Sequence, residues 1–196
     1  MVAQFALTGL DRSAADRLVA EWQRSPLSYA EVGATRGGAG AMPSGYHHDD
    51  QELVLGRDGE VFERAKEGLR RWKAHEGAGV GVHPADAPLT PGTTVLVLAR
   101  IGPIQTRAMC RIVYTVDDEA AFGFAYGTLD LHPVRGEESF VVERRPGGEV
   151  VFHISAFSRP RHPLARLGGP VGRRRQRRMT GGYLESLHVF VTEART

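Results

Sequence analysis

The chain has 196 residues, of which 41% are hydrophobic and 24% are charged, and its formal net charge is +2. These values predict one globular domain and exclude a highly charged, disordered chain. The only cysteine, Cys110, excludes an intrachain disulfide and a zinc site built from several cysteines. No run approaches the roughly 18 apolar residues of a membrane span, and residues 1–10 lack the pattern of a signal peptide, so we expect a cytoplasmic protein.

The front of the chain predicts two helices and two strands. Apolar residues at helical spacing indicate a helix over Asp11–Arg24, which Pro26 ends. Strands are expected at Ser28–Val32 and Tyr46–Leu55. A second helix, Asp58–His75, begins at a residue that suits a cap and repeats apolar side chains every three or four positions.

Six strands are expected to follow in quick succession. Apolar and polar residues alternate along them, which is typical of a sheet with one buried face. Because the connections are short and rich in turn residues, neighbouring strands are expected to be antiparallel. The strands are expected near Gly79–His83, Thr93–Ile101, Gln105–Val116, Ala120–Leu129, Glu137–Arg145 and Glu149–Ser158.

The tail of the chain predicts a long helix, Pro163–Val191. Its first residue suits a first helical position, and Gly168-Gly169-Pro170 is expected to break or kink the helix near its start. Gly181 and Gly182 weaken its middle by about 1 kcal/mol each relative to alanine.

This order of elements resembles the helix-grip fold of the START-related superfamily, which also contains polyketide cyclases and the major birch-pollen allergen. The resemblance implies an α+β fold in which an antiparallel sheet of about six to seven strands wraps around the long C-terminal helix and leaves a cavity between them. Residues 1–28 are then an N-terminal helical extension, and residues 29–196 form a single helix-grip domain.

Two blocks carry a closer resemblance: Tyr126–Phe140, with the pattern YGTLxxHPxxGEExF, and Ala156–Pro160, with the pattern AFSRP. Further matching residues are Tyr29–Thr35, Gly45–His47, Trp72, His75, Gly77–Val80, Gly169-Pro170 and Gln176. Together these blocks are similar to an uncharacterised bacterial and plant family that is known only as a domain of unknown function. The resemblance implies no established activity, so its value is to point to positions.

The block Tyr126–Phe140 places several titratable groups around one strand–loop–strand turn. If Phe140 faces the core, alternation places Glu138 in the cavity and Glu137 on the outside. A carboxylate in an apolar cavity has a raised pKa and suits an acid or a base, with His132 as its partner. The alternative is an ion pair that has no catalytic role. The candidate arginines for such a pair with Glu138 are Arg107, Arg111 and Arg175.

We expect the cavity to bind a small amphipathic molecule, because ligand sites are mostly apolar with a few converging polar groups. The residues expected to contact the ligand are Tyr114, Phe124, Tyr126, Thr128, Glu138, Phe140, Phe152, Arg175 and Gln176, with Ile154 beside them. The first alternative is an enzyme of the cyclase or hydrolase kind that uses Glu138 and His132 as acid and base. The second is an Arg-rich interaction protein that binds nucleic acid or anionic lipid.

No metal and no cofactor are expected. The segment His47-His48-Asp49-Asp50 has metal-binding residue types, but neighbouring residues on a strand point to opposite faces and do not converge. The glycine-rich segments lack the strand–turn–helix context of a phosphate loop. Cys110 is expected to be a small apolar core residue rather than a reactive thiol.

Seven arginines lie between Arg161 and Arg178. No docking motif accompanies them, and aromatic residues do not interleave with them. We therefore favour a solvated helix face over a specific nucleic-acid site.

Overall fold

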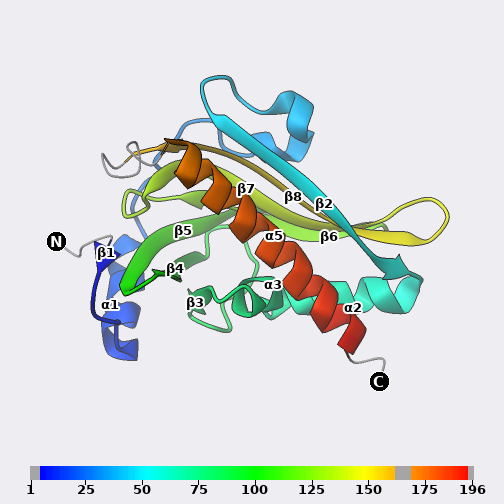
Figure 1. Ribbon diagram of the computed structural model, residues 1–196, viewed down its shortest axis with the longest axis horizontal. Coiled ribbons are helices and arrows are strands. Elements are labelled where there is room, and N and C mark those ends of the chain that lie inside the picture. The colour runs from blue at the N-terminus through cyan, green and yellow to red at the C-terminus, as the bar shows by residue number, and fades with distance from the viewer. Residues whose placement is uncertain (1–4, 162–168, 194–196) are drawn as a thin grey trace.

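The computed structural model describes residues 5–161 and 169–193 (Figure 1). Its elements in chain order are β1 (Phe5–Ala6), α1 (Arg12–Trp22), the 3-10 helices η1 (Ala34–Gly37) and η2 (Ala39–Ala41), β2 (His47–Arg57), α2 (Gly59–Arg70), α3 (Lys73–Gly77), β3 (Gly81–His83), β4 (Thr94–Ile101), β5 (Ile104–Asp117), β6 (Ala121–Thr128), β7 (Val134–Arg144), β8 (Glu149–Pro160) and α5 (Gly169–Glu193).

One antiparallel sheet organises the molecule. Seven strands follow the order β2–β8–β7–β6–β5–β4–β3, and the short strand β1 pairs with β5. Helix α5 crosses one face of this sheet, which we call the inner face, and α2 and α3 pack beside it (Figure 1). The predicted α+β fold, with an antiparallel sheet packed on a long C-terminal helix, is therefore confirmed.

The main core lies between the inner face and the three helices. Phe124, Phe140 and Phe152 are fully buried there, together with Leu69 of α2 and Leu187 of α5. Burial of large apolar side chains is the dominant favourable contribution to folding. In the part of the chain that the structure describes, no helix is long and apolar enough to cross a membrane.

Helices α2 and α5 approach closely because α2 carries a glycine at their contact. A Cβ atom on Gly68 would lie 2.5 Å from Leu187 Cδ1 and 2.8 Å from Phe190 Cδ1. Such distances are far below van der Waals contact, so a side chain at position 68 would force Leu187 and Phe190 to shift.

Two segments cover the outer face of the sheet. At one end, Leu18 of α1 packs in a second apolar cluster with Leu96 and Met109. At the other end, the segment 27–46 lies over β8, and Tyr29 and Met42 pack on Phe157. The expected strand Ser28–Val32 is wrong, because this segment lies on top of the sheet and pairs with it only through an isolated bridge at Leu27.

The expected helix Asp58–His75 is present in its first part but is not continuous. Asp58 caps α2 by accepting a hydrogen bond from the Val61 amide at 2.9 Å, as predicted. The helix breaks at Trp72, which has a left-handed φ of 55°, and α3 then starts in a new direction. The Trp72 indole is buried and donates to the Ala87 carbonyl oxygen at 2.9 Å, so tertiary contacts stabilise a backbone conformation that a non-glycine residue rarely adopts.

The C-terminal helix runs from Gly169 to Glu193 and includes Gly181 and Gly182 without a break. The predicted start at Pro163 lies outside the described residues. Asp11 caps α1 by accepting from the Ala14 amide at 2.7 Å.

Candidate functional site

A row of side chains crosses the inner face from the edge strand β2 to β6. In the strand register, Asp49 of β2 faces Ala156 of β8, Ala156 faces Glu138 of β7, and Glu138 faces Tyr126 of β6. Directly paired residues project to the same side of a sheet. Tyr126 belongs to the main core, so the row points toward α5.

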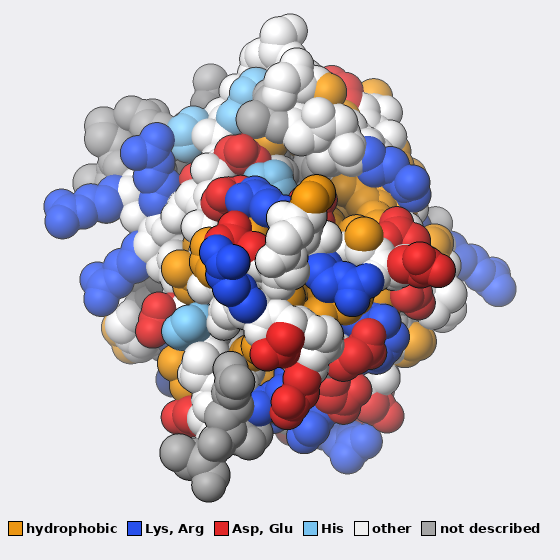
Figure 2. Space-filling view, turned by 90° about the vertical axis from the view of Figure 1, so that its right-hand side faces the viewer, with side chains coloured by type: hydrophobic (Ala, Val, Ile, Leu, Met, Phe, Trp, Pro, Cys, Tyr) orange, Lys and Arg blue, Asp and Glu red, His pale blue; other side chains and the backbone are white. Residues whose placement is uncertain are grey.

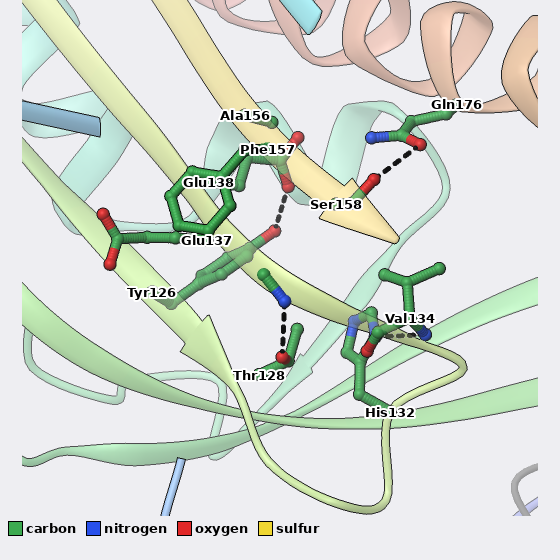
Figure 3. A pocket seen from close by; sticks show the side chains of 11 residues that line it. Tyr126, Thr128, His132, Val134, Glu137, Glu138, Ala156, Phe157, Ser158 and Gln176 are labelled. Atoms are coloured by element: carbon green, nitrogen blue, oxygen red, sulfur yellow. Dashed lines mark hydrogen bonds between the residues drawn. The ribbon is translucent and has the colours of Figure 1, made fainter. Parts of the chain in front are cut away.

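Glu138 is the acidic centre of this row. The Tyr126 hydroxyl donates to its Oε2 at 2.8 Å (Figure 3). Burial raises the pKa of Glu138 to about 7, the hydrogen bond from Tyr126 opposes the rise, and the charge of Asp49 adds to it. Such a pKa lets the carboxyl take up and release a proton near neutral pH, which is a property of acid–base residues.

His75 of α3 is the second neighbour of the Tyr126 hydroxyl, at 3.4 Å from Nε2. It is only 1% exposed, and its ring packs against Phe140 and Tyr183 with centroid distances of 4.8 and 4.7 Å. Burial lowers the pKa of His75 to about 3, so the ring is neutral at neutral pH. Sequence reasoning did not place His75 in the site, although it lies in one of the family blocks.

A small pocket lies beside Glu138, where the ends of β6, β7 and β8 meet α5 (Figure 3). Its volume is about 50 Å³, which is room for a few water-sized groups. Five of the predicted site residues line it together, namely Tyr126, Thr128, His132, Glu138 and Gln176.

Hydrogen bonds fix the walls of this pocket. Ser158 of β8 donates to Gln176 Oε1 of α5 at 3.2 Å, which joins the sheet to the helix. The Gly136 amide donates to Thr128 Oγ1 at 3.0 Å, and the hydroxyl of Ser28 lies 2.7 Å from the same atom. The pocket therefore sits in a polar seam at the end of an otherwise apolar core.

His132 lines the pocket but is tied to its own loop. Its Nδ1 lies 3.1 Å from the amide nitrogen and 3.0 Å from the carbonyl oxygen of Val134. Burial lowers the pKa of His132 to about 4, and the Val134 backbone opposes this only in part. A neutral ring near pH 7 is a poor proton donor.

Tyr114 lies on the outer face, although alternation from Cys110 and Ile112 placed it inward. The reason is a register shift in β5 between Ile112 and Tyr114, which reverses the alternation. The Tyr114 hydroxyl lies 2.7 Å from Thr35 Oγ1, and the Arg36 guanidinium stacks over its ring at 4.2 Å. Tyr114 is thus removed from the pocket.

The predicted aromatic lining residues are packed in the core rather than exposed to the pocket. Phe124 and Phe140 stack with ring centroids 5.2 Å apart, and Phe140 and Phe152 with centroids 6.5 Å apart. All three are fully buried, as is Ile154. Their contact with a ligand stays a prediction. So does that of Arg175, whose side chain lies outside the described part of the structure.

Glu137 is the neighbour of Glu138 along the chain and lies on the outer face, but it does not face water. It is 3% exposed and accepts hydrogen bonds from Tyr29 Oη at 2.6 Å, the Gly33 amide at 2.7 Å, and the amide and hydroxyl of Thr35 at 3.1 and 2.6 Å. Four donors compensate a buried carboxylate well. Glu137 was expected to lie on the outside, and alternation does not show that the segment Tyr29–Thr35 covers it there.

The arginines of β5 do not pair with Glu138. Arg111 lies on the outer face and donates to the carbonyl oxygens of Trp22, Gln23 and Ser25, at the C-terminal end of α1. Arg107 donates to the Thr8 carbonyl oxygen at 3.0 Å. The proposed ion pair of Glu138 with Arg107 or Arg111 is therefore wrong, because both guanidinium groups hold the N-terminal segment.

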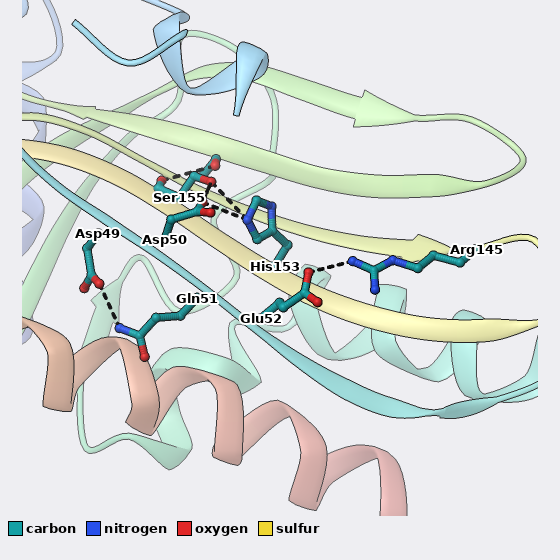
Figure 4. Close-up of polar contacts among 8 residues, drawn as sticks. Asp49, Asp50, Gln51, Glu52, Arg145, His153 and Ser155 are labelled. Carbon is teal, nitrogen blue, oxygen red and sulfur yellow. Dashed lines mark hydrogen bonds and ion pairs between the residues drawn. The ribbon is translucent and has the colours of Figure 1, made fainter. Parts of the chain in front are cut away.

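The acidic residues of β2 alternate between the two faces, as expected (Figure 4). Asp49 accepts from Thr180 Oγ1 of α5 at 3.0 Å and from Gln51 Nε2 at 2.9 Å. Asp50 turns the other way and lies 2.8 Å from His153 Nε2. No group of three metal-binding side chains converges anywhere in the described ranges.

The sequence profile described as "Domain of unknown function (DUF1990)" matches residues 28–186. The chain belongs to this family. A UPF0548 protein of Deinococcus radiodurans is 34% identical over 179 residues, covering 86% of this chain and 89% of the relative. A UPF0548 protein of Arabidopsis thaliana is 30% identical over 139 residues, covering 68% and 67% of the two chains.

Solved structures with a similar fold are more distant in sequence. A hypothetical protein of Helicobacter pylori has a TM-score of 0.59 at 11% identity, over 85% of this chain and 99% of that one. Norcoclaurine synthase of Thalictrum flavum has a TM-score of 0.53 at 12% identity, over 79% and 99% of the two chains. These similarities identify the helix-grip fold of this DUF1990 protein, and at such identities they show the fold alone.

Proposed function

We propose that this protein binds a small amphipathic molecule in the pocket between the sheet and α5, and that Glu138 accepts a hydrogen bond from a donor group of that molecule. The observation that supports this most is the position of a half-buried carboxyl with a pKa near 7 at the wall of the pocket. A carboxyl whose pKa is raised by desolvation at the wall of a pocket is a recognised sign of a functional site.

The hydrogen bonding of Glu138 favours a ligand donor. Tyr126 occupies Oε2, and Oε1 has no hydrogen-bond partner in residues 5–161 and 169–193. An amine or hydroxyl group of a ligand in the pocket would donate a hydrogen bond to Oε1 of Glu138. A ligand carboxylate would instead be repelled by the negative charge of Glu138. The apolar part of the ligand would extend toward Ala156 and Val134, which also line the pocket.

Two structural neighbours support a ligand role for the fold. The norcoclaurine synthase structure holds a transition-state analogue, and another neighbour is a di-domain ARO/CYC protein of the steffimycin biosynthetic pathway with a TM-score of 0.51. We extend to this chain only the general property that such a fold holds a small molecule.

An enzyme of the cyclase or hydrolase kind is the second candidate function, and one observation supports it. Glu138, Tyr126 and His75 form a buried chain of proton-carrying groups, with contacts of 2.8 and 3.4 Å. In such an enzyme Glu138 would be the acid or base. We replace His132 by Tyr126 as its partner in this proposal, because His132 is held by the Val134 backbone.

The proposal keeps a cytoplasmic location, which agrees with a single buried and unpaired cysteine, Cys110. It also assigns no specific nucleic-acid role to the C-terminal arginines. On the face shown in Figure 2, basic and acidic side chains are interspersed.

Three small probe molecules that differ only in their polar group test whether the pocket prefers a ligand with a hydrogen-bond donor. Saturation-transfer NMR near pH 8.5, where Glu138 is ionised, should show binding of benzylamine, weaker binding of benzyl alcohol and none of benzoate. Glu138→Gln should weaken benzylamine binding about tenfold, because a charge-assisted hydrogen bond is lost. Glu143→Gln is the control, since Glu143 lies on the same strand but is exposed. Equal binding of benzoate and benzylamine, or full retention in Glu138→Gln, would contradict the proposal.

A further inference from the structure

Two arginines face each other on the outer side of the sheet. In the register of β7 and β8, Arg135 is directly opposite Arg159. Each lies two residues from a residue of the outer face, Glu137 and Phe157 respectively, so both project to that face. Like charges at directly opposite positions of an antiparallel pair destabilise a sheet, and this arrangement therefore calls for an explanation.

Arg135 is half-buried and lacks a partner for one of its donors. Its Nε atom is buried without any hydrogen-bond partner. Within residues 5–161 and 169–193, Arg135 also forms no ion pair. A buried charged donor without an acceptor is costly, so an acceptor that the chain does not supply would stabilise it.

Arg159 is exposed but held in a defined orientation. Its guanidinium lies 4.6 Å from the centroid of the Tyr46 ring, and that ring packs edge-on against Phe157. The Tyr46 hydroxyl donates to Glu31 at 2.8 Å, which fixes the ring from its other end. The guanidinium is thus positioned before any ligand arrives, which reduces the entropic cost of binding.

Two carboxylates of the outer face, Glu31 and Glu137, already accept hydrogen bonds, although the charge of Arg159 also acts on Glu31. Glu31 accepts hydrogen bonds from Tyr46 and from the Ala30 amide. Glu137 accepts four hydrogen bonds from the segment above it. Neither forms an ion pair with Arg135 or Arg159 in the part of the chain described.

We propose that Arg135 and Arg159 form a binding site for a phosphate group on the outer face of the sheet. This site is separate from the Glu138 pocket, because it lies on the other side of the sheet. A carboxylate is satisfied by one guanidinium fork. A phosphate carries more acceptor oxygens and more charge at neutral pH, so it can engage two forks together and relieve their mutual repulsion.

The site can be tested with inorganic phosphate as the probe. In ¹H–¹⁵N spectra that record the arginine Nε–Hε groups, phosphate should shift the signals of Arg135 and Arg159 in a saturable way. Arg135→Gln and Arg159→Gln should each weaken this binding about tenfold or more, as expected for loss of charge-assisted hydrogen bonds. Arg135→Lys should weaken it too, since it keeps the charge but not the planar fork.

Arg144→Gln is the matched control. Arg144 is an exposed arginine of the same strand that also lies over an aromatic ring, that of Phe62 at 5.8 Å. This variant should bind phosphate as the unmodified protein does. Equal weakening in Arg144→Gln would show unspecific charge attraction, and either that result or the absence of a saturable shift would overturn the proposal. Acetate that competes as well as phosphate would also overturn it.

A second arm distinguishes the source of the phosphate. Vesicles of phosphatidylcholine with phosphatidic acid are sedimented with the protein. Co-sedimentation that Arg135→Gln abolishes would support the site with a lipid headgroup as its ligand. Binding of inorganic phosphate without co-sedimentation would support the site with a soluble phosphate compound.

Discussion

Glu137 and Glu138 are adjacent on β7, yet their carboxylates lie on opposite faces of the sheet and in different hydrogen-bonding environments. Glu137 accepts four hydrogen bonds from the segment Tyr29–Thr35. Glu138 has one donor, Tyr126, and burial raises its pKa to about 7. The hydrogen bonds to Glu137 hold the covering segment on the sheet. Glu138 lies beside a pocket and has too few hydrogen-bond donors to offset its desolvation.

The two glutamates should therefore respond differently to the same substitution. Glu137→Gln places an amide donor among four donors and should destabilise the protein by about 2–4 kcal/mol. Glu138→Gln removes a costly buried charge and should leave stability near pH 8 unchanged or raised by about 1 kcal/mol. Urea unfolding of both variants measures this. A larger loss for Glu138→Gln than for Glu137→Gln would contradict the assignment.

The pH dependence of stability should contain two opposing contributions. The pKa of Glu138 rises from 4.5 to about 7 on folding, so its destabilising effect is absent below pH 4.5 and grows as the pH rises to about 7. The pKa of His75 falls from 6.5 to about 3, so its contribution to stability is complete above pH 6.5 and is lost as the pH falls toward 3. Each of these two groups changes the free energy of unfolding by at most about 1.4 kcal/mol per pH unit, and the two changes have opposite signs.

Glu138→Gln should reveal the histidine contribution that Glu138 offsets. Between pH 6.5 and 4.5 this variant should lose stability on acidification more steeply than the unmodified protein, because the opposing Glu138 contribution is gone while those of His75 and His132 remain. Thermal melts across this range measure the difference. Parallel curves for the two proteins would show that Glu138 has no raised pKa.

Tyr126→Phe should raise the pKa of Glu138 further. The Tyr126 hydroxyl donates to the carboxylate and opposes the effect of burial, so its removal leaves desolvation unopposed. A titration of the Glu138 side-chain carboxyl followed by ¹³C NMR should show a midpoint above about 7. A midpoint that falls would mean that the hydrogen bond stabilises the protonated form instead.

Two glycine substitutions in helices should have opposite effects. Gly68→Ala forces a Cβ atom against Leu187 at the contact of α2 with α5 and should destabilise the protein by about 1–3 kcal/mol. Gly181→Ala meets nothing within 4 Å and should stabilise α5 by up to about 1 kcal/mol. Denaturation midpoints compare the two, and a stabilised Gly68→Ala variant would refute the packing described here.

Most of the fold could be predicted from the sequence, because alternation, helical spacing and turn residues are local signals. They placed the sheet and its antiparallel order correctly, and they indicated that Glu138 shares a face with Phe140. The break at Trp72 could not be predicted in this way, since it depends on a hydrogen bond to Ala87, fifteen positions further along the chain.

The misplaced parts of the candidate site have similar causes. A single register shift in β5 moved Tyr114 to the outer face, and no residue type in that strand signals it. Glu137 was expected to face outward because alternation does not show which distant segment covers a face. His75 ends the expected helix Asp58–His75, far from Tyr126 in the sequence, and only the fold brings the two side chains together.

Native mass spectrometry of the protein, purified under mild conditions, tests the central claim most directly. The unmodified protein should retain a small molecule, and Glu138→Gln should remain folded and lose it, while Glu143→Gln should keep it. If both the unmodified protein and Glu138→Gln retain the same molecule to the same extent, or if neither binds one from a cell extract, the pocket at Glu138 is not a ligand site.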